Sequence, residues 1–145
     1  MADMTVRFYS EVTIGGEKKT IEHTNSVAGL TQIYDQTLEL TSTECQVFAV
    51  AAAEAGASLA DFTFMYLENL DSSTAIDFVI EHTSGTQVCW LKIPAGKFVV
   101  LWNRSLNADD DATAGSAPTF VNMDLIEAKT PSSTAKLRIV VADDT

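Results

Sequence analysis

Hydrophobic and polar residues alternate with period two along much of the chain, which is the pattern of β-strands with one buried face. The first such run covers 4–14, and its apolar residues share one parity: Val6, Phe8, Val12 and Ile14. Gly15 and Gly16 separate it from a second run over 17–24. A tight hairpin turn needs positive φ at both central residues, which glycine adopts without strain. The pattern therefore predicts a β-hairpin formed by these two runs.

Similar short runs, separated by turn residues, continue to the end of the sequence. Further strands are predicted over 33–40, 45–50, 62–70, 75–82, 88–93, 97–103, 121–128 and 135–141. The alanine-rich segment within 51–60 favours a helix, but Gly56 would end it after little more than one turn, so we interpret this segment as a linker. No helical pattern recurs between strands. Nine or ten short strands predict an all-β fold, an antiparallel β-sandwich of jelly-roll type, as a single domain over 1–145.

The alternation also predicts which side chains form the core. The expected core residues are Phe8, Phe48, Phe64, Tyr66, Phe78, Ile80, Trp90, Phe98, Val100, Leu125, Ile139 and Val141. Tyr66, Trp90, Phe98 and Trp102 are also the residue types of a sugar-stacking platform, but their alternating neighbours favour burial. Trp102 is the exception, because the polar pair Asn103-Arg104 follows it and an aromatic beside arginine is typical of an interface anchor.

Composition and charge narrow the classes of partner. The 145 residues include 46% hydrophobic and 20% charged side chains, which is unlike a long disordered chain. Acidic residues outnumber basic ones 20 to 9, giving a net charge of −11. This charge disfavours binding to nucleic acid or to an anionic membrane. No apolar run approaches the roughly 18–20 residues of a membrane span, and no leader pattern begins the sequence, so we expect a soluble protein made in a cytoplasm.

Residues capable of catalysis or metal binding are few and poorly spaced. His23 and His82 both follow glutamate at polar strand ends, and no nucleophile motif, zinc motif or phosphate-binding loop accompanies them. Cys45 and Cys89 lie in apolar runs and are expected to be reduced core thiols. We therefore predict no enzyme, no catalytic residue, no cofactor and no tightly held metal.

Acidic residues concentrate in two polar segments. The alternating oxygen donors of the first are Asn107, Asp109, Asp111 and Thr113, but the glycine and glutamate that a calcium loop needs are replaced by Ala112 and Pro118. A solvated acidic loop within 105–119 is the expected structure, with a loosely held cation as the alternative. Asp143 and Asp144 are expected to form a charged tail.

Several stretches resemble a known group of virus proteins. They run from Phe64 to Asp71, from Ile76 to Ile80 and from Leu91 to Leu101, and the closing segment from Ile126 to Val141 is similar in outline. Their layout resembles small β-sandwich structural proteins of tailed bacteriophage particles, above all capsid decoration (cement) proteins. The resemblance implies a virion component on the capsid surface, synthesised in the host cytoplasm. It carries no catalytic residues.

The expected function is therefore binding to the outside of a phage head and stabilising it. The expected partners are the major capsid protein and further copies of the chain, as a trimer or dimer. Contacts are expected in the loop within 105–119 and at seven candidate interface residues: Ala2, Asp3, Met4, Thr5, Trp102, Asn103 and Arg104. Two alternatives remain, a tail-associated carbohydrate- or receptor-binding β-sandwich, and a jelly-roll metalloenzyme, for which two histidines are too few.

Overall fold

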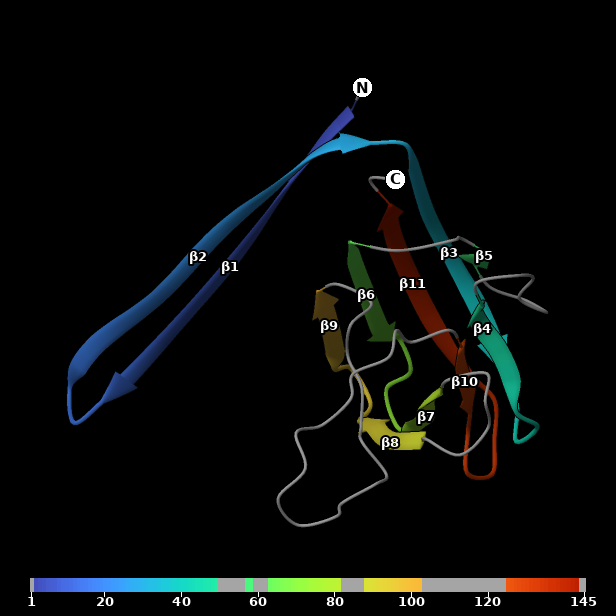
Figure 1. Ribbon diagram of the computed structural model, residues 1–145. Coiled ribbons are helices and arrows are strands. Elements are labelled where there is room, and N and C mark those ends of the chain that lie inside the picture. Colours follow the sequence, from blue (N-terminus) through green and yellow to red (C-terminus); the bar gives the residue numbers. More distant parts are fainter. Residues whose placement is uncertain (1, 50–56, 59–62, 82–87, 103–124, 144–145) are drawn as a thin grey trace, which may run out of the picture.

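The computed structural model describes residues 2–49, 57–58, 63–81, 88–102 and 125–143, and these form three sheets without a helix (Figure 1). The strands are β1 (Ala2–Ile14), β2 (Glu17–Leu30), β3 (Gln32–Leu40), β4 (Cys45–Ala49), β5 (Ala57–Ser58), β6 (Phe64–Asn69), β7 (Ile76–Glu81), β8 (Val88–Ile93), β9 (Phe98–Trp102), β10 (Leu125–Lys129) and β11 (Ala135–Asp143). The predicted all-β fold is confirmed. Most strands end within a few residues of the predicted runs, and β5 lies in the segment that we interpreted as a linker.

Two of the sheets make up the body of the molecule. One has the strand order β5-β4-β10-β7-β8 and the other has the order β3-β11-β6-β9. All their pairings are antiparallel except the short parallel contact between β4 and β5. Each sheet contributes alternate apolar side chains to a shared core, which is the arrangement of a β-sandwich.

The core between the two sheets follows the period-two pattern. In β11, every second side chain from Ala135 to Val141 is buried. The largest fully buried side chains are Phe48, Phe78, Leu40, Met65, Leu67, Ile76, Ile93, Ile126, Leu137 and Ile139. Cys45 and Cys89 form no disulfide with each other and are half-buried against this core. They therefore lie at the margin of the core rather than inside it, and their reduced state stays a prediction.

The predicted core is wrong for one face of β6 and β9. Met65, Leu67 and Leu101 are buried in the core, whereas Tyr66 and Val100 are half-buried and Phe98 is 54% exposed. These two strands are apolar at both parities, so alternation alone does not say which face is inside. On the other sheet Trp90 is 51% exposed, and Leu125 is only half-buried beside the fully buried Ile126.

A buried asparagine fixes the turn between β6 and β7. The Nδ2 atom of Asn69 donates to the carbonyl oxygens of Thr74 and Ile93, at 2.8 and 3.0 Å. Its Oδ1 atom accepts from the backbone N–H of Asp71 at 3.0 Å. The Asp71 carboxylate in turn accepts from the backbone N–H groups of Ser73 and Thr74, and these bonds hold its pKa below its usual range. Asn69 thus joins β6, the turn and β8.

The third sheet is a long hairpin of β1 and β2 that extends away from the body (Figure 1). We call this hairpin the arm. Gly15 and Gly16 form its turn with φ of 62° and 85°, as the sequence predicts. Phe8 belongs to the arm and is half-buried, so its predicted place in the sandwich core is wrong. The arm pairs only with itself among the described strands, opposing Ile14 to Glu17 at its far end.

Candidate functional site

The base of the arm is held to the body by a second apolar cluster. Its buried members are Val27, Leu30, Phe64 and Ala142, and its half-buried members are Met4, Val6, Tyr66, Val100 and Trp102. The rings of Phe64 and Trp102 meet edge to face with centroids 5.0 Å apart. Beside the cluster, Gly29 has a φ of 77° and its N–H donates to Asp3 at 3.2 Å, where the pairing of β1 and β2 is irregular.

The sequence-predicted interface residues fall partly in this cluster. Met4 and Trp102, which are far apart in the sequence, both pack there, and the exposed residues Ala2, Asp3 and Thr5 adjoin Met4 in β1. Asn103, Arg104 and the 105–119 loop lie outside the described residues. Met4 and Trp102 already have an intramolecular role at the base of the arm, and their role in an interface stays a prediction.

The arm has one apolar and one polar face. Residues opposed in an antiparallel pair share a face, so the register sorts the side chains. The face that we call apolar carries Met4, Val6, Phe8, Val12, Ile14, Ile21 and Val27, and between them the polar residues Ser10, Glu17, Lys19, His23 and Asn25. Beyond the base it is uncovered, since Ile14 and Ile21 are 65% and 68% exposed. The polar face is tied by ion pairs, Arg7 with Glu22 at 2.6 Å and Lys18 with Glu11 at 2.7 Å.

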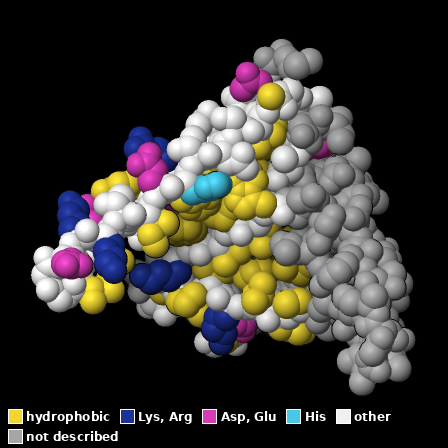
Figure 2. All heavy atoms as spheres, turned by 60° about the vertical axis from the view of Figure 1, so that its left-hand side comes forward, with side chains coloured by type: hydrophobic (Ala, Val, Ile, Leu, Met, Phe, Trp, Pro, Cys, Tyr) yellow, Lys and Arg dark blue, Asp and Glu magenta, His cyan; other side chains and the backbone are white. Residues whose placement is uncertain are grey.

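The body presents a second, partly exposed apolar surface next to the arm. On the outer side of β6 and β9, Tyr66, Phe98 and Val100 lie together, and we call these three residues the aromatic face. The rings of Tyr66 and Phe98 are 5.4 Å apart, and burial, with a smaller contribution from Glu68, raises the pKa of Tyr66. Figure 2 shows hydrophobic side chains gathered over this side of the molecule, beneath and beside the arm. Apolar surface thus continues from the arm onto the body.

Further along the same sheet the surface becomes charged. Arg138 on β11 donates two hydrogen bonds to Asp35 on β3, at 3.0 and 2.9 Å. This bidentate contact lowers the pKa of Asp35 and raises that of Arg138. The aromatic face is therefore bounded by a charged pair.

The opposite sheet carries a separate exposed aromatic. The Nζ atom of Lys129 lies 5.0 Å from the ring centre of Trp90 and 2.5 Å from a Glu44 oxygen. Lys92 contacts Asp77 at 3.3 Å beside it. Trp90 is thus part of a small polar and aromatic surface rather than of the core.

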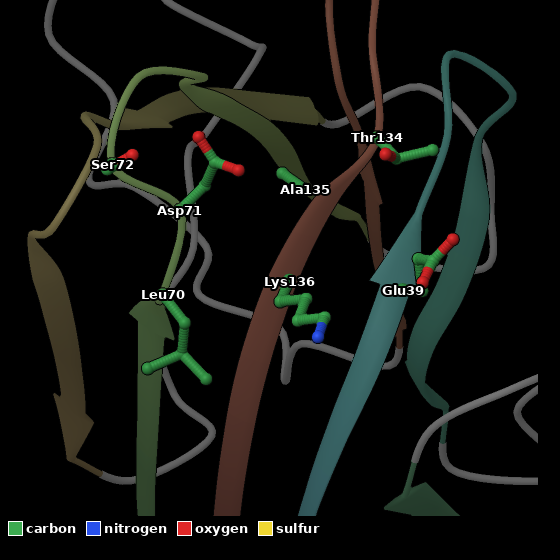
Figure 3. A pocket seen from close by; sticks show the side chains of 7 residues that line it. All are labelled: Glu39, Leu70, Asp71, Ser72, Thr134, Ala135 and Lys136. Carbon is green, nitrogen blue, oxygen red and sulfur yellow. The ribbon is translucent and has the colours of Figure 1, made fainter.

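A shallow hollow of about 310 Å³ lies across the ends of β3, β6 and β11 (Figure 3). It is lined by Glu39, Leu70, Asp71, Ser72, Thr134, Ala135 and Lys136. Glu39 and Lys136 are cross-strand neighbours, and Asp71 is engaged in its own turn. The lining includes neither a histidine nor a cysteine. The Asp71 carboxylate has a lowered pKa, so it is a poor proton donor.

The other candidates for chemistry are scattered. His23 is exposed on the arm opposite Phe8, while His82 and the acidic positions 109–111 lie outside the described residues. Within the described ranges, no three His, Cys, Asp or Glu side chains lie close enough together to hold a metal. Asp143 is not part of a solvated tail, because it is 4% exposed and its backbone oxygen accepts from the N–H of Thr31. This placement corrects the prediction for that residue.

Sequence reasoning missed the arm tip, and it weighed exposure of Tyr66 and Phe98 but favoured their burial. A signal was present in the second run, because 17–24 contains one apolar residue, Ile21, which is too few for a strand that lines a sandwich core. In the part of the chain that the structure describes, no helix is long and apolar enough to cross a membrane. Comparisons of the chain with models of protein families, with curated proteins and with solved structures found no match.

Proposed function

We propose that the protein is a structural virion protein that binds the outer surface of a phage head as a decoration protein and stabilises it together with further copies of itself. Such a role requires surfaces that bind other proteins, and it does not require a chemical reaction. The supporting observation is the arm, which extends from the two-sheet body and exposes Ile14 and Ile21 at its far end. An apolar element that its own fold leaves uncovered is typical of a contact with another protein.

Charge is consistent with a position on the outside of the head. The net charge of −11 makes contact with packaged DNA repulsive. Reinforcement of a shell depends on many copies, because modest interface energies at each copy add over the whole assembly. The acidic segment 109–111 is expected to face solvent.

Particle stability is the test of this function. Particles assembled without the protein are expected to form, but to lose their DNA at a lower temperature and after a milder osmotic shock than complete particles. The physical reason is the loss of the bridging contacts between neighbouring capsid subunits. DNA release during a thermal ramp, measured with a dye, checks this. Equal robustness of the two kinds of particle would contradict the proposal.

A carbohydrate- or receptor-binding role at the tail is the second candidate. It is favoured by Trp90 and Phe98, which we expected to be buried and which are about half exposed. Aromatic rings on an accessible surface are what sugar binding uses. Labelled protein found at the tail tip, together with loss of host attachment in a Trp90→Ala variant and no change in particle stability, would favour this function over decoration.

A further inference from the structure

The arm and the body touch at the base of the arm. Beyond this contact, the arm and the body each continue with an apolar surface of their own. At the base, Met4 and Val6 of the arm pack against the cluster that contains Tyr66 and Val100. Past the base, the arm keeps its apolar face through Val12, Ile14 and Ile21, and the body keeps its own through Phe98. Within one chain, the apolar face of the arm and the apolar surface of the body lie apart beyond the base, because the arm extends away from the body (Figure 1).

A two-stranded ribbon of this length needs support. An isolated hairpin is marginally stable at best in water, and stability comes when a hydrophobic face is covered by a further layer. The polar face of the arm has its ion pairs, but its apolar face beyond Phe8 has no cover among the described residues. Cover for Val12, Ile14 and Ile21 must therefore come from outside the described residues.

We propose that the arm tip, residues 8–23, packs its apolar face on the aromatic face of a second copy of this chain. The tip supplies Phe8, Val12, Ile14 and Ile21, and the second copy supplies Tyr66, Phe98 and Val100. Each copy has one arm tip and one aromatic face. Two copies can therefore dock their tips on each other in a dimer, or each copy can dock its tip on the next copy in a closed ring. Both surfaces become buried in one step.

The chemistry of the base identifies a second copy as the occupant. The same ribbon face already packs on the outer side of β6 and β9 through the second apolar cluster, so the two surfaces are compatible in shape and polarity. When the tip docks on another copy, the same kind of apolar contact forms between the next residues along the arm and the neighbouring residues of the aromatic face. The chain therefore contains both halves of the proposed interface.

The distribution of charge also favours this contact. Residues 2–30 hold four acidic and three basic side chains, so −10 of the net charge of −11 lies in the rest of the chain. Two copies repel each other over most of their surface, and the arm is the part that a strongly acidic body repels least. On the apolar face of the arm, Lys19 is opposite Val12 and Glu17 is opposite Ile14. On the body, Glu68 is opposite both Phe98 and Arg138, so neither surface carries a large charge of one sign.

The area is adequate when arms are exchanged both ways. Seven residues from 8 to 14 extend about 23 Å, and two paired strands are about 10 Å wide, which gives a footprint of about 230 Å². Two arms, each covering area on both partners, bury about 900 Å², close to the roughly 1,000 Å² of a specific but weak interface. We therefore expect a dissociation constant of about 1–100 µM.

The inference rests on the self-association in the proposed function and not on binding to a capsid. It is tested with the purified full chain in the absence of particles, so its failure is distinguishable from a failure of the decoration role. Wild-type protein is expected to associate in sedimentation equilibrium. The tip variant Ile14→Asp with Ile21→Asp, and the face variant Phe98→Asp, are each expected to raise the dissociation constant by about 100-fold or more.

Two matched controls separate docking from charge and folding. Thr13→Asp with Thr24→Asp adds the same charge to the polar face of the arm, where the opposing residues are Lys18 and Arg7. Leu70→Asp adds one acid at an exposed apolar position outside the aromatic face. Both controls are expected to associate as wild type. Circular dichroism confirms folding, and the corresponding serine variants replace any aspartate variant that does not fold.

A mixing experiment decides which surfaces meet. The tip variant keeps its aromatic face and the face variant keeps its tip, so a mixture of the two retains one of the two contacts. The mixture is expected to associate more strongly than either variant alone and more weakly than wild type. Three results would overturn the proposal: wild-type protein that stays monomeric up to about 1 mM, a tip or face variant that associates as wild type, or a mixture that associates no more strongly than either variant alone. A face variant that associates as wild type while the tip variant does not would indicate tip-to-tip contact.

Discussion

Replacing Asn69 by aspartate is expected to destabilise the fold by about 3–5 kcal/mol, the cost of an uncompensated charge among buried groups. Asn69 is fully buried, and its Nδ2 atom satisfies the carbonyl oxygens of Thr74 and Ile93. A carboxylate places a negative oxygen against both carbonyls and removes both donors. The β6–β7 turn and its tie to β8 are lost together.

Chemical unfolding measures this effect. Asn25→Asp is the matched control, since it makes the same substitution at an exposed position of the arm and is expected to change the free energy of unfolding by less than about 0.5 kcal/mol. The penalty of Asn69→Asp is expected to shrink at acidic pH, because the neutral acid can donate one hydrogen bond. Equal stability of the two variants at neutral pH would contradict the role of Asn69.

The second large effect is expected from Phe78→Ala, at about 3–5 kcal/mol, because Phe78 is 1% exposed between the two sheets and truncation leaves a cavity there. Phe98→Ala is the informative comparison. Its ring is about half exposed and contacts Tyr66, so its removal is expected to cost about 1 kcal/mol or less.

Urea unfolding of the two alanine variants, with unchanged slopes, gives both values. Phe78→Ala should have the much lower midpoint. Equal losses would mean that Phe98 lies inside the sandwich, as its alternation with Val100 suggests from the sequence alone, and that the observed faces of β9 are reversed.

Most strands of the body were predictable because they are short and bounded by turn residues. The run 88–93 and the Gly15-Gly16 turn agree with the structure to the residue. The faces were less predictable where both parities are apolar. In β6, the sequence Phe64-Met65-Tyr66-Leu67 offers two apolar faces, and the buried one is the face that packs against the second sheet. That choice depends on tertiary packing and not on local pattern.

Which strands pair with one another could not be predicted from the sequence. β11 pairs with β3 and β6, and the contact of Arg138 with Asp35 joins residues 103 apart. No local signal specifies so distant a partner. By contrast, Met4 and Trp102 were chosen by separate arguments and lie in the same cluster.

The arm was not predicted from the sequence for a different reason. Its alternation is as regular as that of a core strand, because an amphipathic ribbon and a half-buried strand follow the same pattern. The distinguishing information lies in the polar partner strand β2, where Ile21 is the only apolar side chain between 17 and 24. A regular strand with a polar partner indicates a hairpin that depends on contacts outside its own sheet.

Hydrogen exchange at two protein concentrations tests most directly the claim that the arm is completed by another copy. In dilute protein, amides of residues 8–23 are expected to exchange much faster than those of β11, which pairs on both sides in the centre of its sheet. At a concentration where the protein associates, protection of residues 8–23 is expected to rise while that of β11 stays constant. Protection of residues 8–23 that is the same at both concentrations would contradict the claim.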